Sequence, residues 1–368
     1  MKFASHREVL CRSLCAGLMT LAACGGGSDA PVMGSGYVAT SLVTDVNASG
    51  NPYSGAHTDA HLVNPWGIAF NPQGFVWVCD NASSTSTLYD GSGVAQSLVV
   101  AIPAGTAGPA KPTGIVFNAG QEFQVSQGGV SGASPFIFAG EVGTIAGWSP
   151  NVNLTNAITV FDGAASGKIY KGLAIGSQAG AGRLFAADFH NGAVDVFDGT
   201  FAPITVPGGF VDTTLPAGYA PFGIQVIGSL VYVAYAKQDA AQEDEVAGAG
   251  LGIVNTFDFS GNLVKRLITA GGKLNAPWGI AMAPANFGAF SNALLVANFG
   301  DGRINAYDPA SGASLGTLST PAGTPIAVDG LWGIAFGNGI NGQPVNTLFY
   351  TAGPADETHG VYGRIDSQ

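Results

Sequence analysis

The stretch Pro277-Trp278-Gly279-Ile280-Ala281-Met282 decides the fold of this chain, because five further stretches repeat its pattern. In each copy a turn-forming or bulky pair of residues precedes a glycine, and an apolar run follows it. The other copies are Pro65-Trp66-Gly67-Ile68-Ala69-Phe70, Pro112-Thr113-Gly114-Ile115-Val116-Phe117, Tyr170-Lys171-Gly172-Leu173-Ala174-Ile175, Pro221-Phe222-Gly223-Ile224-Gln225-Val226 and Leu331-Trp332-Gly333-Ile334-Ala335-Phe336. The six glycines recur at intervals of 47 to 58 residues, which indicates a repeated structural unit.

Each copy is followed by further strand-like segments. A second apolar strand is predicted at residues 76–79, 123–126, 184–187, 230–234, 294–297 and 348–351. A third segment alternates apolar and polar residues, as at residues 193–199. Glycine and proline interrupt every window of helical length. The sequence therefore predicts an all-β, six-bladed β-propeller whose first strands converge on a central channel, where close approach of the backbones favours glycine.

The two ends of the repeat region predict how the ring closes. Residues 37–43 form a strand-like run before the first copy, and residues 360–365 form another after the last copy. We expect the N-terminal strand to join the last blade beside the C-terminal strand, because this pairing removes an exposed edge. The propeller is therefore predicted to span residues 37–368.

Residues 1–23 have the features of a lipoprotein signal peptide. Lys2, Arg7 and Arg12 precede a short apolar stretch, and small residues lead to Cys24. The apolar stretch is too short to span a bilayer, and an ordinary secretory signal with a chance cysteine is the alternative. We predict lipidation of Cys24, a flexible Gly/Ser tether at residues 24–36, and a lipid-anchored protein at the outer membrane of a Gram-negative bacterium, facing the periplasm or the exterior.

Composition excludes one class of partner. The 368 residues carry a net charge of −11, and no basic run lies in the predicted mature region. Such a chain lacks the electrostatic footprint of a nucleic-acid-binding protein, so we expect no nucleic-acid partner. We also expect a monomer. Of the four cysteines only Cys79 lies within the predicted propeller, in an apolar strand, and we interpret it as a buried structural thiol.

Several phrases of the sequence carry a family resemblance. Residues 219–225, 274–279, 298–306 and 330–333 resemble an uncharacterised family of secreted bacterial propellers, some of which carry a PEP-CTERM tail. The resemblance extends over residues 37–366 and implies a fold without an activity. More distantly, the repeat is similar to NHL-type propellers and to calcium-dependent lactonase/phosphotriesterase propellers.

The second resemblance implies a test for metal chemistry. Those hydrolases hold calcium through Asn or Asp residues just before the strand glycine, and calcium takes six to eight oxygen ligands. In this chain the same positions hold no carboxylate or amide; they are Trp66, Thr113, Lys171, Phe222, Trp278 and Trp332. The sequence therefore favours a binding module over an enzyme, and a metal-dependent hydrolase of the lactonase/esterase class is the alternative.

The same six positions are the candidate ligand-binding residues. By propeller symmetry they are expected to cluster at one mouth of the channel, where aromatic rings stack on apolar or sugar faces and indole N–H groups donate hydrogen bonds. Lys171 would offer a cation to an anionic group. In the alternative interpretation the rings pack together and plug the hub. The expected partner is a protein, a glycan or a small molecule.

Metal candidates outside these positions are weak. Asp239 and Asp244 lie in the acidic loop 238–246, which would bind calcium through its carboxylates or would simply be a solvated loop. His57 and His61 would share a metal only if their segment were helical. Glu141 is a further isolated carboxylate. We predict no cofactor, with calcium at the acidic loop as the alternative. The catalytic residues are unknown, since the sequence contains no nucleophile motif.

Overall fold

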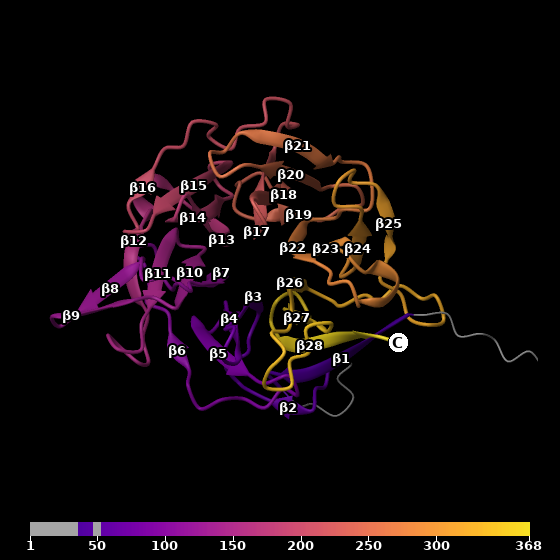
Figure 1. The fold of residues 1–368 in the computed structure, drawn as a ribbon, viewed down its shortest axis with the longest axis horizontal. Helices are drawn as coiled ribbons and strands as arrows, with labels where there is room; N and C mark the ends of the chain where they lie inside the picture. The colour runs from indigo at the N-terminus through magenta and orange to yellow at the C-terminus, as the bar shows by residue number, and fades with distance from the viewer. Residues whose placement is uncertain (1–35, 47–52) are drawn as a thin grey trace, which may run out of the picture. The chain divides into compact units, whose positions relative to one another are not determined.

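The computed structural model describes residues 36–46 and 53–368, and these residues form a six-bladed β-propeller. The predicted signal peptide and Cys24 lie outside the described residues. The blades are antiparallel sheets, apart from one short parallel pair at the outer edge of blade 6, and the six sheets stand in a ring around a channel (Figure 1). None of the helices in the described residues has the length and hydropathy of a transmembrane span.

The first three blades follow the order of the chain from the channel outward. Blade 1 contains β3 (Pro65–Phe70), β4 (Val76–Asp80), β5 (Thr85–Tyr89) and β6 (Val100–Ala101). Blade 2 contains β7 (Pro112–Phe117), β10 (Phe136–Gly140), β11 (Thr144–Trp148) and β12 (Ile158–Asp162). Blade 3 contains β13 (Tyr170–Gln178), β14 (Ala181–Asp188), β15 (Ala193–Asp198) and β16 (Pro203–Ile204). A short 3-10 turn, Ala164–Ser166, precedes β13.

The last three blades complete the ring. Blade 4 contains β17 (Tyr219–Ile227), β18 (Leu230–Gln238), β20 (Ile253–Phe257) and β21 (Leu263–Ile268), and β19 (Glu245–Val246) pairs with β18. Blade 5 contains β22 (Pro277–Met282), β23 (Leu294–Asn298), β24 (Ile304–Tyr307) and β25 (Ser314–Thr317), with a 3-10 turn at Gly288–Phe290. Blade 6 contains β26 (Leu331–Phe336), β27 (Leu348–Ala352), β28 (Val361–Ser367), β1 (Tyr37–Thr44) and β2 (His57–Thr58).

The predicted closure of the ring is confirmed. Strand β1 pairs antiparallel with β28 from Tyr37 opposite Ser367 to Thr44 opposite Val361. The first strand of the described chain thus covers the edge of the last blade, which would otherwise be open to pairing with another chain. Its inward residues join the apolar packing between blade 6 and its neighbours.

The six signature glycines are required by the close approach of neighbouring inner strands. A Cβ on Gly67 would lie 2.6 Å from the carbonyl oxygen of Thr113, and a Cβ on Gly279 would lie 2.5 Å from that of Trp332. A Cβ on Gly333 would meet the carbonyl oxygen of Trp66 at the same distance, so the contact passes from the last blade to the first. Any larger residue at these positions would push adjacent blades apart.

One predicted strand is wrong. The second strand of blade 2 is β10 (Phe136–Gly140) and not residues 123–126. Most of that segment lies in β8 (Gln124–Gln127), which forms a separate two-stranded hairpin with β9 (Val130–Ala133) on the outer side of the blade (Figure 1). The prediction that Cys79 is a buried thiol is confirmed, since this free cysteine exposes 0% of its surface.

Candidate functional site

The inner strands begin at one mouth of the channel and end at the other, so the two mouths have different side chains. The residues just before the six glycines lie at the first mouth, which we call the hub face. The residues after the glycines line the opposite mouth, which we call the funnel. The side chains of the two mouths determine what each can bind.

The six candidate ligand-binding residues are buried at the hub face. Trp332, Phe222 and Thr113 expose none of their surface, and Trp278, the most exposed of the six, exposes 9%. Trp332 stacks on Trp66 with ring centroids 3.5 Å apart and on Phe299 at 4.1 Å. The aromatic rings therefore pack on one another across the channel, and their role in binding a ligand stays a prediction.

Most polar groups of these residues bond within the protein. The indole N–H of Trp278 donates to the carbonyl oxygen of Lys171 at 2.7 Å, and that of Trp332 donates to Asn64 Oδ1 at 3.2 Å. The hydroxyl of Thr113 lies 2.8 Å from the carbonyl oxygen of Tyr170. The buried indole N–H of Trp66 has no hydrogen-bond partner among the described residues. These bonds tie blade 5 to blade 3, blade 6 to blade 1 and blade 2 to blade 3 at the hub.

The anionic partners of Lys171 come from the chain itself. Its ammonium is 2.5 Å from Glu141 Oε1 and 3.0 Å from Asp244 Oδ1, and it lies 5.2 Å from the centre of the Trp66 ring. Burial alone would lower the pKa of Lys171, but Glu141, Glu245 and Asp244 outweigh it and raise that pKa. Lys171 is therefore a buried cation whose charge the neighbouring carboxylates stabilise.

The carboxylates around Lys171 come from equivalent loops of three blades. Glu141 follows β10 in blade 2, Asp244 and Glu245 follow β18 in blade 4, and Glu357 follows β27 in blade 6. Each of these loops joins the second strand of its blade to the third. Sequence analysis missed this convergence, although the position of each carboxylate after a second strand was a usable signal.

Asparagines hold two of these carboxylates in place. Asn81 Nδ2 donates to Glu141 Oε2 at 3.2 Å, and Asn64 Nδ2 donates to Glu357 Oε1 at 3.1 Å. Asn64 also accepts the Trp332 indole N–H, so the polar layer is bonded directly to the aromatic layer. The acidic loop is therefore not merely solvated, since Asp244 reaches across the hub face to Lys171.

Glu245 gives the hub face a pH dependence. Burial raises the pKa of the Glu245 carboxyl to about 7; Lys171 lowers it, and Glu357 and Asp244 raise it. The folded chain thus keeps a proton that the unfolded chain releases above about pH 4.5. The free energy of unfolding therefore has a contribution from Glu245 that is present below about pH 4.5 and is lost as the pH rises to about 7.

Glu245→Gln is expected to remove this loss. Urea midpoints at pH 5 and pH 8 should differ less in the variant than in the wild type, because glutamine does not titrate. Glu243→Gln, two positions away on the exposed side of the loop, is the control and should follow the wild type. Equal pH dependence in wild type and Glu245→Gln would show that Glu245 titrates normally.

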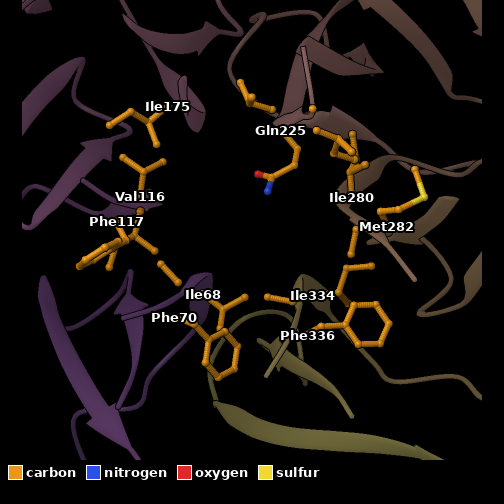
Figure 2. A pocket seen from close by; sticks show the side chains of 17 residues that line it. Ile68, Phe70, Val116, Phe117, Ile175, Gln225, Ile280, Met282, Ile334 and Phe336 are labelled. Carbon is orange, nitrogen blue, oxygen red and sulfur yellow. The ribbon is translucent and has the colours of Figure 1, made fainter. Parts of the chain in front are cut away.

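The funnel is an open cavity of about 580 Å³ at the opposite mouth (Figure 2). All six inner strands contribute to its wall, and all but one of its lining side chains are apolar; the bulky ones are Ile68, Phe70, Ile115, Val116, Phe117, Ile175, Val226, Ile227, Ile280, Met282, Ile334 and Phe336. Figure 2 shows Gln225 pointing into the opening, where it is the one polar side chain of the lining. The funnel thus combines an apolar wall with a single amide.

Gln225 breaks the symmetry of the repeat. It occupies the second position after the signature glycine, and the other five copies carry small or apolar residues there: Ala69, Val116, Ala174, Ala281 and Ala335. Below Gln225 the funnel continues into a narrow space of about 60 Å³, lined by Gly67, Gly114, Gly279 and Gly333 and bounded by Trp278. The funnel is therefore open toward solvent and bounded at its narrow end by the aromatic cluster.

The weak metal candidates do not converge. Asp239 Oδ1 accepts the backbone N–H of Glu243 at 3.0 Å, and His61 Nδ1 lies 3.1 Å from Asp59 Oδ1. His57 lies in β2 at the outer edge of blade 6. Within residues 36–46 and 53–368 no three His, Cys, Asp or Glu side chains form a group that could hold a metal ion. The hydrolase alternative and its calcium stay predictions.

Comparison with known proteins supports the fold and identifies relatives. The family model of the NHL repeat matches residues 62–87. The uncharacterised protein R648 of Acanthamoeba polyphaga mimivirus is 33% identical over 319 residues, which cover 84% of this chain and 76% of that protein. The uncharacterised protein L690 of the same virus is 32% identical over 318 residues, covering 84% and 82%. The predicted NHL-like character is therefore confirmed, while the resemblance to secreted bacterial propellers stays a prediction because these relatives are viral.

A solved structure shares the architecture. A streptogramin B lyase structure superposes with a TM-score of 0.52 at 12% sequence identity, covering 90% of this chain and 98% of that chain. Identity at this level shows the fold alone, since one propeller fold carries many unrelated activities.

Proposed function

Since this chain belongs to the same family as the mimivirus proteins R648 and L690, whose names assign no activity, we propose its function from the geometry of its own channel. We propose that it is a ligand-binding propeller. The funnel takes a small apolar molecule that carries one hydrogen-bonding group. We also propose that the protein is exported and carries a lipid anchor at Cys24. Only the sequence of residues 1–36 supports this part of the proposal.

The observation that carries the proposal is a large cavity whose lining side chains are all apolar except for the amide of Gln225. Ligand sites in proteins are typically concave and mostly apolar, with few polar groups that orient the ligand. A cavity of about 580 Å³ lies within the range of such sites. Transfer of apolar ligand surface from water to this wall would supply most of the affinity, and Gln225 would fix the orientation.

We favour the funnel over the hub face as the ligand site, because the side chains of the hub face already pack on and bond to one another. Trp66, Phe222 and Trp332 already pack on other rings and expose at most 2% of their surface. Phe70, Phe117 and Phe336 also pack on other rings, but they are only half-buried and line the open cavity. A ligand would therefore gain new apolar contacts at the funnel without breaking existing ones.

Ala335→Phe is expected to weaken binding of N-phenyl-1-naphthylamine by at least about tenfold. This neutral dye has an apolar body and one N–H group, and its fluorescence rises in an apolar site. Ala335 borders both the funnel and its narrow end, so a phenyl ring at this position would fill space that the dye needs. Fluorescence titration of the purified chain measures the dissociation constant.

Two further variants make this experiment specific. Val264→Phe adds a phenyl ring at an exposed position of β21, outside the funnel, and should bind the dye like the wild type. Gln225→Leu should weaken binding by about fivefold, which corresponds to the loss of one hydrogen bond. Equal affinity of wild type and Ala335→Phe would contradict a site in the funnel.

A further inference from the structure

Gln225 offers an unbonded amide to a molecule that enters the funnel. The residue is exposed, and its side chain forms no hydrogen bond with any of the described residues. It lines both the funnel and the narrow space below it, so it lies where the two meet. Figure 2 shows the amide pointing into the opening. Its N–H donors and its carbonyl acceptor are therefore both available to a ligand.

No charged side chain accompanies this amide. Among the described residues, those that line the funnel and the narrow space include no Asp, Glu, Lys, Arg or His. The indole N–H of Trp278, at the narrow end, is already donated to the carbonyl oxygen of Lys171. A carboxylate or an ammonium would lose hydration here without gaining a counterion, which is unfavourable. The polar group of a ligand for this site is therefore expected to be neutral.

A primary amide matches one arrangement of polar atoms better than others. It presents one N–H donor and one carbonyl acceptor side by side. The complementary group has a donor and an acceptor on one edge, and glutamine pairs with the edge of adenine in this bidentate way. Open-chain secondary amides are trans and place the N–H and the C=O on opposite sides. A ring holds the two groups on the same side, as in a lactam.

We propose that the funnel selects apolar molecules that carry a cyclic amide. This inference rests on the proposed function, since it takes the funnel as the ligand site, and it names the group that Gln225 recognises. The apolar part of the ligand packs on side chains such as Ile280 and Ile334, and its lactam edge bonds to the nitrogen and the oxygen of the Gln225 amide. The other five copies of the signature carry Ala or Val at this position, so the side-chain recognition comes from blade 4 alone.

Titration calorimetry with three probes tests the proposal. 2-Quinolinone has the N–H and the C=O on one edge, 1-methyl-2-quinolinone lacks the N–H, and acetanilide is a trans amide of similar size. The wild type should bind 2-quinolinone about tenfold more tightly than either of the other two, which corresponds to one or two additional hydrogen bonds. Equal affinity of the wild type for 2-quinolinone and 1-methyl-2-quinolinone would overturn the proposal.

Variants at Gln225 assign the preference to this side chain. In Gln225→Leu the affinities for the two quinolinones should differ by less than about twofold, because the amide is gone. Gln225→Glu should bind protonated 2-aminoquinoline more tightly than 2-quinolinone at pH 6, since an ionised carboxylate only accepts hydrogen bonds and this cation has two donors on one edge. Gln124→Leu, at an exposed position of β8 outside the funnel, is the control and should keep the wild-type preference. A preference that persists in Gln225→Leu would also overturn the proposal.

The dye N-phenyl-1-naphthylamine keeps this test separate from that of the proposed function. If the dye binds the wild type and binds Ala335→Phe weakly, but 2-quinolinone binds no better than its methyl derivative, the funnel is a ligand site without selectivity for cyclic amides. That result contradicts this inference alone. If neither the dye nor 2-quinolinone binds, the funnel is not the ligand site, and the proposed function and this inference both fail.

Discussion

Replacing Glu141 with alanine is expected to lower the free energy of unfolding by about 3 kcal/mol. The reason lies in Lys171, which exposes only 1% of its surface and whose ammonium bonds to Glu141 and Asp244. Removal of Glu141 leaves a buried cation with Asp244 as its remaining ion-pair partner, and Asp244 is 73% exposed, so solvent screens it. Breaking one side of a buried ion pair typically costs about 3–5 kcal/mol, and the remaining pair places this variant at the lower end.

A double-mutant cycle separates the stranded charge from lost packing. Glu141→Ala combined with Lys171→Met should recover to within about 1 kcal/mol of the wild type, because the buried charge is gone and methionine keeps most of the volume. Lys111→Ala is the control, since its ammonium is exposed and should contribute less than about 0.5 kcal/mol. Urea denaturation measures the wild type, the two single variants Glu141→Ala and Lys171→Met, the double variant and the control. If the double variant is as unstable as Glu141→Ala alone, the loss comes from packing and not from charge.

The fold could be predicted because its cause is local and repeated. Each signature glycine abuts the backbone of the next inner strand, a carbonyl oxygen in five copies and the nitrogen of Leu173 at Gly114, so the same steric requirement returns six times in the sequence. The closure by residues 37–43 was predictable as well. The strands at the two ends of the repeat region would each leave an open edge, and pairing them with each other removes both edges.

The second strand of blade 2 shows what local sequence does not contain. Residues 123–126 and 136–140 are both apolar enough for a strand, and the first of them comes directly after the signature. Only residues 136–140 pair with β7. Residues 124–127 instead form a hairpin with β9, whose turn lies at Gly128 and Gly129, where both residues have positive φ. The choice depends on a long-range pairing and not on propensity.

The hub chemistry was missed for a similar reason. Glu141, Asp244 and Glu357 lie in loops of different length, so no fixed spacing links them to Lys171 in the sequence. In the sequence Glu141 looked isolated and Asp244 looked like one of several acids in a solvated loop, and their convergence exists only once the ring has closed. The bulky residues before the glycine pack together across the narrow hub, as in the alternative interpretation of the sequence, and the residues after it line the funnel.

Trp332→Ala is expected to lower the free energy of unfolding by about 3–5 kcal/mol, the range for deleting a large buried aromatic side chain. Trp332 is fully buried and stacks on Trp66 and Phe299, and it also contacts Phe222 and Trp278. These rings come from blades 1, 4 and 5, so one side chain joins four blades. Its loss would also leave Asn64 Oδ1 without the indole donor at a buried position.

Conservative variants show whether packing alone sets this value. Trp332→Phe keeps part of the stacked area but loses the indole N–H, and it should cost about 1–3 kcal/mol. Phe336→Ala, on the same strand but bordering the open funnel, should cost less than Trp332→Ala, because a half-buried ring has fewer contacts to lose. Urea midpoints give the comparison. A cost for Trp332→Ala below that of Phe336→Ala would mean that the neighbouring rings collapse into the vacated space, and that the hub is held by its carboxylate network and not by its aromatic cluster.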